Sequence, residues 1–338
     1  MDTTSNVLPK IDCHVHLVGN GSNGSGCVLR LNGRHKIQAS IMIHQYGLPR
    51  SALYGPLEQL YIDKLVEMLR RSSLDAAVVL AHEWARDENG VVIEGFGSLY
   101  VPNTYVLEVA KEHPELLPGI SINPSRPDAM EELERGLEGG AVLMKCLPNC
   151  QNFNPSNPKF KKFWERMAEA GLPLLAHTGG EFSLPVYNHQ YSDPALLEFP
   201  LSLGVKVIGA HCGTPSLYFD PNYLATFARL LQKYPNLVGD NSGLMTPVRS
   251  RHFRTILKEP YLSRMVYGSD IPIPISGLWN LLRGTVNLKT FWKSRAERNI
   301  FERDYQLKLA MGFPAESFTR VSSILRLSPT QRSFLKLP

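Results

Sequence analysis

Two histidines one residue apart, His14 and His16, are the most informative pair in this sequence of 338 residues. They lie in an apolar segment, residues 10–17, that has the composition of a β-strand. Side chains at positions i and i+2 of a strand point to the same face, so both imidazoles can bind one metal ion. The pair therefore predicts a metal site close to the start of the chain.

Other polar residues follow apolar runs further along the chain. These residues are His82 with Glu83, Asn123, Lys145, His177, His211, Asp240 with Asn241, and Asp270. In a parallel α/β barrel such strand ends converge on one face, where the chemistry takes place. The three imidazoles of His14, His16 and His177 and the carboxylate of Asp270 suit zinc, with manganese or iron as alternatives.

A divalent ion held by four such ligands can leave one position open for water. It lowers the pKa of that water toward ~7, which makes hydroxide available at neutral pH. Asp270 could then take the proton of the water as a base. His211 could complete a second metal site, or hydrogen-bond to the water or the substrate.

The elements that must position these residues alternate between strands and helices. We predict eight strands, at residues 10–17, 75–82, 119–123, 141–147, 173–177, 205–211, 237–241 and 265–270. Four of them start at a constant step of 32 residues, the length of one strand–helix unit. Nearly continuous apolar strands are typical of a parallel sheet that is buried on both faces. We therefore predict a single-domain (β/α)8 TIM barrel over residues 8–338, with extra C-terminal helices outside it at 283–338.

An open, doubly wound sheet is the alternative fold. Gly19, Gly21 and Gly24 have the G-x-G-x-x-G spacing of a dinucleotide-binding turn, but residues 25–33 show no helical periodicity after them. The barrel is therefore preferred, and residues 17–56 are predicted to form a lid loop over its mouth.

Composition limits the partners. The chain holds 36 Lys and Arg against 31 Asp and Glu, and residues 283–338 alone carry 11 basic against 4 acidic side chains. No nucleic-acid motif accompanies this basic segment, so we expect no nucleic-acid partner. No apolar run approaches ~18 residues and residues 1–8 lack a secretory signal, so we expect no membrane contact. The five cysteines, an odd number without framework spacing, favour reduced thiols and a cytoplasmic location.

Five motifs together carry a family resemblance. They occupy residues 12–16 (DCHVH), 144–147 (MKCL), 175–179 (LAHTG), 209–213 (GAHCG) and 267–270 (YGSD). In this order they resemble the amidohydrolase superfamily, and specifically the amidohydrolase-2 branch that includes relatives of aminocarboxymuconate-semialdehyde decarboxylase. The resemblance implies that His14, His16, His177 and Asp270 are metal ligands and that His211 is a ligand or catalytic histidine. It is also compatible with a homodimer.

Three further residues are candidates for substrate binding. Lys145 is a carbamate bridge between two metals, a cation for an anionic substrate, or a side chain that extends to solvent. Glu181 lies four residues after His177 in a glycine-rich loop; it contacts the metal ligands or the substrate, or it is a solvated loop acid. Arg249 follows the seventh strand, where a guanidinium could bind a substrate carboxylate through two hydrogen bonds; the alternative is that it only begins a surface helix. His82 and Glu83 are weaker candidates for the same pocket.

Three functions are compatible with this pattern. A hydrolase would attack an amide, ester or lactone carbonyl with activated water, and a lyase would decarboxylate a small carboxylated substrate at the same site. A non-catalytic barrel with a structural metal would bind a partner through its basic C-terminal segment. The candidate ligands lie at the catalytic face of the barrel, which argues against a non-catalytic barrel with a structural metal. We therefore expect a metal-dependent hydrolase acting on a small anionic molecule.

Overall fold

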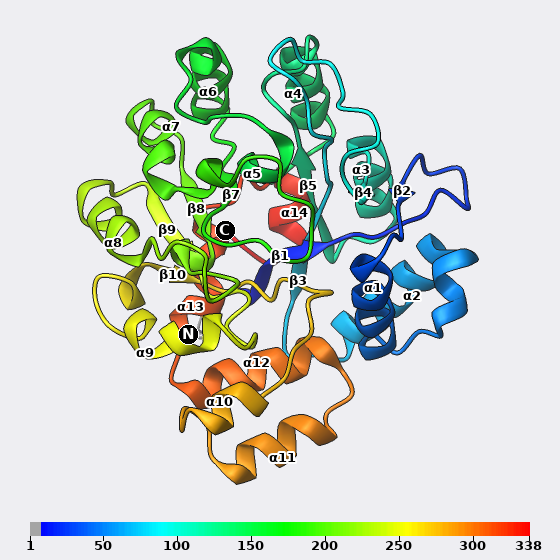
Figure 1. The fold of residues 1–338 in the computed structure, drawn as a ribbon, viewed down its shortest axis with the longest axis vertical. Helices are drawn as coiled ribbons and strands as arrows, with labels where there is room; N and C mark the ends of the chain where they lie inside the picture. The colour runs from blue at the N-terminus through cyan, green and yellow to red at the C-terminus, as the bar shows by residue number, and fades with distance from the viewer. Residues whose placement is uncertain (1–7) are drawn as a thin grey trace, which may run out of the picture.

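The computed structural model describes residues 8–338 and contains a barrel of parallel strands (Figure 1). In barrel order the strands are β1 (Ile11–His16), β3 (Ala76–Leu80), β5 (Leu116–Ser121), β6 (Leu143–Cys146), β7 (Leu174–His177), β8 (Val207–Ala210), β9 (Leu237–Asp240) and β10 (Met265–Val266). A parallel bridge between Val15 and Ile271 joins the two ends of the sheet. The predicted (β/α)8 barrel is therefore confirmed.

The strands are apolar on both faces because both faces are buried. In β3, Ala77 and Val79 pack in the cluster between the sheet and the outer helices, whereas Val78 and Leu80 pack in the cluster inside the barrel. Successive side chains of a strand point to opposite faces, so a strand with two buried faces has no polar alternation. This is the physical origin of the apolar runs in the sequence.

Helices surround the barrel. In chain order they are α2 (Leu57–Arg70), α3 (Asn103–Glu112), α4 (Ala129–Glu138), α5 (Pro148–Gln151), α6 (Lys161–Glu169), α7 (Glu198–Ser202), α8 (Leu224–Lys233), α9 (Phe253–Ile256) and α10 (Leu278–Leu282). Helix α8 shows why a glycine is needed at the sheet. A Cβ added at Gly209 of β8 would lie 2.2 Å from the Phe227 ring, so only glycine lets this ring contact the strand.

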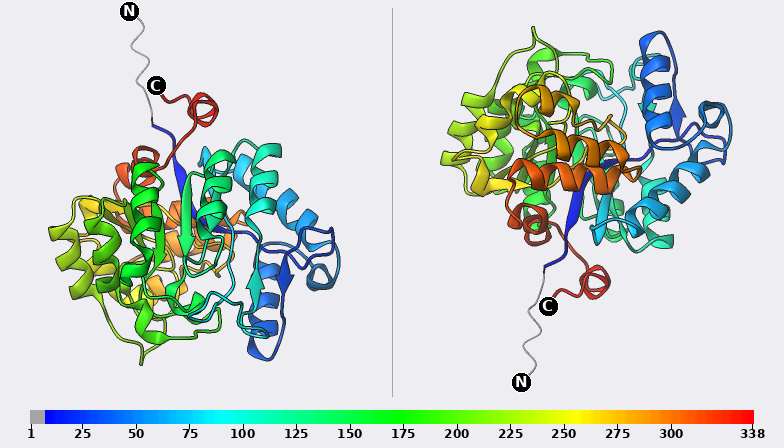
Figure 2. Two further views of the ribbon diagram at one scale, coloured as in Figure 1. Left: turned by 90° about the horizontal axis from the view of Figure 1, so that it is seen from above. Right: turned by 90° about the horizontal axis from the view of Figure 1, so that it is seen from below.

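The extra C-terminal helices predicted from the sequence are present. They are α11 (Leu288–Ala296), α12 (Ile300–Met311), α13 (Glu316–Thr319) and α14 (Pro329–Phe334). Val321, Leu325 and Leu335 from this region join the cluster inside the barrel. Figure 2 shows α13 and α14, in red, at the end of the barrel where β1 begins, whereas dark-blue α1 lies toward the opposite end. The part of the chain that contains α13 and α14 therefore closes the barrel on the side away from the strand ends that carry the polar residues.

Residues 17–56, predicted as a lid loop, contain regular structure. Strand β2 (Val28–Leu29) pairs with β4 (Leu99–Tyr100), and helix α1 (Arg34–Gln45) and a short 3-10 helix (Arg50–Tyr54) follow. Helix α1 has no side-chain N-cap and exposes Ile37 and Ile41, so it lacks the single apolar stripe by which a helix is found in a sequence. That this segment acts as a lid stays a prediction.

The glycine-rich start of this segment is held by one buried carboxylate. Glu58 of α2 accepts hydrogen bonds from Gly21 N at 2.5 Å, Ser25 Oγ at 2.9 Å and Ser22 Oγ at 2.8 Å. The G-x-G-x-x-G spacing therefore belongs to a loop bound to α2, and no helix begins at its end. No helix in the described part of the chain combines the length and apolar character that crossing a bilayer requires.

Candidate metal centre

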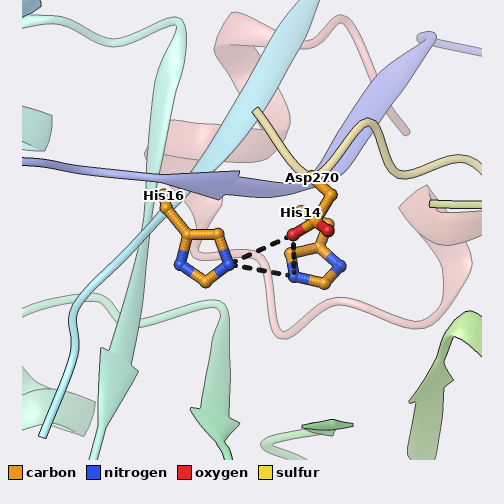
Figure 3. A group of neighbouring side chains, drawn as sticks. All are labelled: His14, His16 and Asp270. Carbon is orange, nitrogen blue, oxygen red and sulfur yellow. Dashed lines mark hydrogen bonds and ion pairs between the residues drawn. The ribbon is translucent and has the colours of Figure 1, made fainter. Parts of the chain in front are cut away.

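Three of the predicted ligands converge at the carboxyl ends of β1 and β10 (Figure 3). His14 Nε2 lies 3.2 Å from His16 Nε2 and 3.2 Å from Asp270 Oδ1, and the distance from His16 Nε2 to Asp270 Oδ1 is 3.3 Å. Ligand atoms about 2.0–2.1 Å from a tetrahedral zinc are separated by roughly 3.3–3.4 Å. The spacing of the three atoms therefore matches that of ligands to one ion.

Asp240, at the end of β9, fixes the orientation of His14. Its Oδ2 lies 2.7 Å from His14 Nδ1, and its Oδ1 accepts hydrogen bonds from His211 N and Ser242 N. Burial alone would raise the pKa of Asp240, but the His14 imidazole and the hydrogen bonds hold it well below its usual range. An ionised carboxylate can only accept, so Nδ1 carries the proton and the Nε2 lone pair faces the centre.

Asp240 is recognisable in the sequence as a polar strand end, but the sequence assigns it no role. Its position as the last residue of β9 was the signal, because strand ends of a barrel lie on one face. The contact to His14 spans 226 positions, and no local pattern encodes it.

His177 and His211, at the ends of β7 and β8, lie next to this group. The ring centroids of His14 and His211 are 5.5 Å apart, and those of His211 and His177 are 5.1 Å apart. Within residues 8–338, His177 Nε2 is buried and has no hydrogen-bond partner; Glu181 Oε2 lies 3.7 Å away. His177 is thus outside the compact trio, but it presents an unpaired nitrogen to the same space.

Burial keeps these imidazoles neutral. Desolvation lowers the pKa of His16 to about 4 and the pKa values of His177 and His211 well below the usual range. A neutral imidazole is the form that binds metal. The donor set, the spacing and the unpaired nitrogen of His177 together show that these residues fit a divalent metal ion.

Lys145, at the end of β6, lies in the centre. Its side chain is buried, and Nζ is 2.9 Å from His14 Nε2. Burial lowers the pKa of this lysine. The amino group therefore does not extend to solvent, and the carbamate and the substrate-binding cation remain as its two predicted roles.

Glu181 and Arg249 both line the cavity, but both already make hydrogen bonds to the protein's own backbone. Glu181 Oε1 accepts from Ser183 N at 2.5 Å and Leu184 N at 3.0 Å, and burial raises its pKa. Arg249 donates to the carbonyl oxygens of Thr214 and Gly180. The guanidinium thus links the loops after β7 and β8 to the loop after β9, and two of its nitrogens already have protein partners.

Other polar residues considered for the pocket lie beside it. His82 and Glu83 border a separate, smaller pocket that also contacts Trp84 and Phe96. Glu83 accepts a hydrogen bond from Arg126 at 2.7 Å and so belongs to a cluster of ion pairs outside the metal ligands.

The backbone at two site residues adopts an unusual conformation. Asp270 has φ 68° and His211 has φ 62°, both in the left-handed region that non-glycine residues rarely occupy. Each residue in this conformation destabilises the folded state by about 1–3 kcal/mol, and such residues cluster at functional sites. Asp270 N donates to His14 O at 2.8 Å, so the strained residue is tied to the strand that carries the other two ligands.

The site opens into a large cavity. The cavity has a volume of about 590 Å³ and is lined by the metal-ligand candidates, by Lys145, and by residues of α1 and of the loops after β7, β8 and β9. A volume in this range accommodates a small organic molecule. The residues predicted from the sequence therefore form the polar part of one pocket.

A (β/α)8 barrel with histidines and a carboxylate converging at its strand ends defines the class of metal-dependent barrel enzymes. The Amidohydro_2 family model, described as Amidohydrolase, matches residues 11–288. The chain therefore belongs to this amidohydrolase family, as its motifs indicated.

Solved structures share the fold at low sequence identity. An uncharacterized TIM-barrel protein from Bordetella bronchiseptica has a TM-score of 0.54 at 15% identity, covering 89% of this chain and 99% of its own. An IDCase from Metarhizium anisopliae has 0.52 at 11%, covering 99% of both chains. The 5-carboxyvanillate decarboxylase LigW from Sphingomonas paucimobilis has 0.50 at 10%, covering 98% and 100%. Comparison with curated proteins gives no match.

Proposed function

We propose that the protein is a metal-dependent hydrolase that cleaves an amide, ester or lactone bond of a small anionic substrate. The observation that carries the proposal is that His14 Nε2, His16 Nε2 and Asp270 Oδ1 lie 3.2–3.3 Å from one another at the wall of a large cavity. These three residues would hold the ion, with His177 as the fourth ligand. Zinc is the preferred metal, and manganese or iron are alternatives.

When bound, a divalent ion polarises a carbonyl oxygen and lowers the pKa of water. The protein's own contribution is proton transfer. Asp270 directs Oδ1 toward His14 and His16, whereas Oδ2 lies 3.9 Å from His211 Nε2. In this arrangement Oδ2 takes the proton of the attacking water and returns it to the leaving group, and neutral His211 hydrogen-bonds to the reacting atoms.

Lys145 is the substrate-binding cation in this proposal. Its amino group is buried beside His14, where a substrate carboxylate can approach it without competing water. Glu181 and Arg249 support the site indirectly. Glu181 Oε2 lies 3.7 Å from His177 Nε2, and Arg249 donates to Gly180 O in the loop that carries Glu181. The substrate is a small molecule, and a homodimer and a cytoplasmic location remain expectations from the sequence.

Decarboxylation of a small carboxylated substrate is the second candidate. The position of Lys145 favours it, because a buried amino group 2.9 Å from His14 Nε2 can pair with the carboxylate that is lost. In that reaction the bond to the carboxyl carbon breaks, its electron pair stays on the substrate carbon, and Asp270 or His211 delivers a proton there.

The metal content tests the proposed site. Plasma mass spectrometry would compare the wild type with His14→Ala and Lys145→Ala, and with His113→Ala as a control outside the cavity. We expect one equivalent in the wild type, lost in His14→Ala but kept in Lys145→Ala, because Lys145 binds substrate and not the ion. Two equivalents that fall to one or none in Lys145→Ala would show a carbamate-bridged pair and would overturn the role of Lys145 as a cation. A wild type that binds no metal after reconstitution with zinc, manganese or iron would contradict both candidate functions.

Activity provides the second readout. Release of acid from aryl esters, lactones and N-acyl amino acids would be followed beside release of CO2 from aromatic and unsaturated carboxylic acids. Acid release that disappears in His14→Ala and Asp270→Asn supports the hydrolase. CO2 release without acid release would overturn it in favour of the lyase.

A further inference from the structure

The α1 wall of the cavity contains two buried polar atoms that the chemistry above does not use. They are His35 Nε2 and Gln38 Oε1, and neither has a hydrogen-bond partner among residues 8–338. The two residues are three positions apart on α1, so they share one face of the helix, and both line the cavity. Buried polar atoms are nearly always paired, so two unpaired atoms on one face indicate that a ligand supplies the partner.

The orientation of Gln38 defines what that partner must be. Its Nε2 lies 3.4 Å from the carbonyl oxygen of Phe182, in the loop after β7. This contact assigns the amide nitrogen to the protein and leaves Oε1 as a free acceptor. The ligand group opposite Gln38 must therefore donate a hydrogen, which excludes a second carboxylate at this position.

Most of the remaining cavity wall is apolar. It includes the side chains of Leu31, Ala39, Ile43, Leu53, Leu184 and Val248. These side chains offer no hydrogen bonds, so the part of the ligand that contacts them must be a hydrocarbon chain or ring.

We propose that the substrate has a carboxylate-bearing reactive end, an apolar body, and a hydroxyl that binds His35 and Gln38. This inference rests on the proposed function for the reactive end and extends it to the opposite wall. A hydroxyl satisfies both atoms, because it donates its single hydrogen to Gln38 Oε1 and accepts one from His35 Nε2. His35 and Gln38 are then specificity-determining residues, since a site built around a hydroxyl rejects the analogue that lacks it.

Binding of matched ligand pairs tests this inference without requiring turnover. The first pair is ω-hydroxydodecanoate and tridecanoate, which have equal length, and the second is para-hydroxyphenylhexanoate and para-tolylhexanoate. Isothermal titration would measure Kd for wild type, Gln38→Met and His35→Phe. Ile37→Ala, on α1 but exposed and outside the cavity lining, is the matched control.

We expect the wild type and Ile37→Ala to bind the hydroxylated member of at least one pair tenfold or more tighter. Gln38→Met and His35→Phe should reduce that preference to threefold or less, while helical content and metal content stay unchanged. Equal binding of both members by the wild type, no binding of either pair, or a preference that survives both substitutions would overturn the inference. Because the readout is binding, a hydroxyl preference in a protein that proves to be no hydrolase would leave this inference standing. Hydrolysis without such a preference would overturn this inference but leave the proposed function standing.

Discussion

Replacing Asp240 by Asn should weaken metal binding strongly although Asp240 is not itself a predicted ligand. The carboxylate accepts the Nδ1 proton of His14 across 2.7 Å, and both residues are completely buried. An amide can turn its NH2 toward Nδ1, which shifts the imidazole proton to Nε2. The nitrogen that faces the centre would then have no lone pair for a metal.

The expected magnitude follows from the type of hydrogen bond that is lost. A hydrogen bond to a charged group contributes about 1.5–3 kcal/mol, and 1.4 kcal/mol corresponds to a factor of about ten, which gives roughly 10–150-fold in the dissociation constant. Partners of metal-bound histidines typically contribute 10–100-fold to metal affinity. We therefore expect about a 100-fold loss of zinc affinity in Asp240→Asn.

A zinc competition titration against a chromophoric chelator measures this loss. Asp193→Asn is the control, because Asp193 also accepts a backbone hydrogen bond, from Ala195 N at 2.8 Å, but it lies outside the cavity lining. Unfolding of the chelator-treated proteins shows separately whether the fold is affected. Zinc affinity within threefold of the wild type, in a folded Asp240→Asn protein, would refute the reasoning about His14.

Two further predictions concern stability. Burial lowers the pKa of His82 to about 3, so below its unfolded value of about 6.5 the unfolded chain binds a proton that the native protein does not. The free energy of unfolding of metal-free protein should therefore fall with decreasing pH, and His82→Gln should reduce this slope by about 1.4 kcal/mol per pH unit between about pH 6 and 4. Denaturant titrations at several pH values test this, with exposed His44→Gln as control; an unchanged slope in His82→Gln would contradict it. Lys308 Nζ donates to Gly268 O and Asp304 Oδ2 with no exposure, so Lys308→Met should cost about 3–5 kcal/mol by leaving a buried carboxylate unpaired. Adding Asp304→Leu should recover part of that loss in chemical denaturation, and a double variant less stable than Lys308→Met would show that the pair is not the cause.

The strand ends were predictable from the sequence because burial on both faces makes each strand a short apolar run that stops at a polar residue. His14, His16 and Asp270 could be grouped on that basis, since the carboxyl ends of barrel strands meet on one face. The contact between Asp240 and His14 could not, because it depends on how β9 lies relative to β1 across the barrel. The hydrogen bonds of Arg249 to backbone carbonyls of two other loops could not be predicted either, because loop conformation leaves no pattern in a sequence; that Arg249 binds a substrate stays a prediction.

Helix α1 shows a second limit. A helix is recognised by one apolar stripe, but α1 exposes Ile37 to solvent, whereas Ala39, Met42 and the half-exposed Ile41 line the cavity. Its apolar residues therefore serve two surfaces, and the periodicity is lost. The polar residues His35 and Gln38 were similarly uninformative, because their significance depends on the cavity that they line.

The junction between β1 and β10 is where the barrel closes, and the predicted ligands lie on both sides of it. Hydrogen bonds from Cys13 N to Tyr267 O, from Asp270 N to His14 O and from His16 N to Ile271 O join the two strands. β10 itself has only two residues in strand conformation. An ion bound by His14, His16 and Asp270 would thus fasten together parts of the chain that are 256 positions apart, 270 minus 14. The centre can form only after nearly the whole barrel has been synthesised and closed, so metal loading would report completed folding, and metal loss would loosen the molecule first where its beginning meets its end.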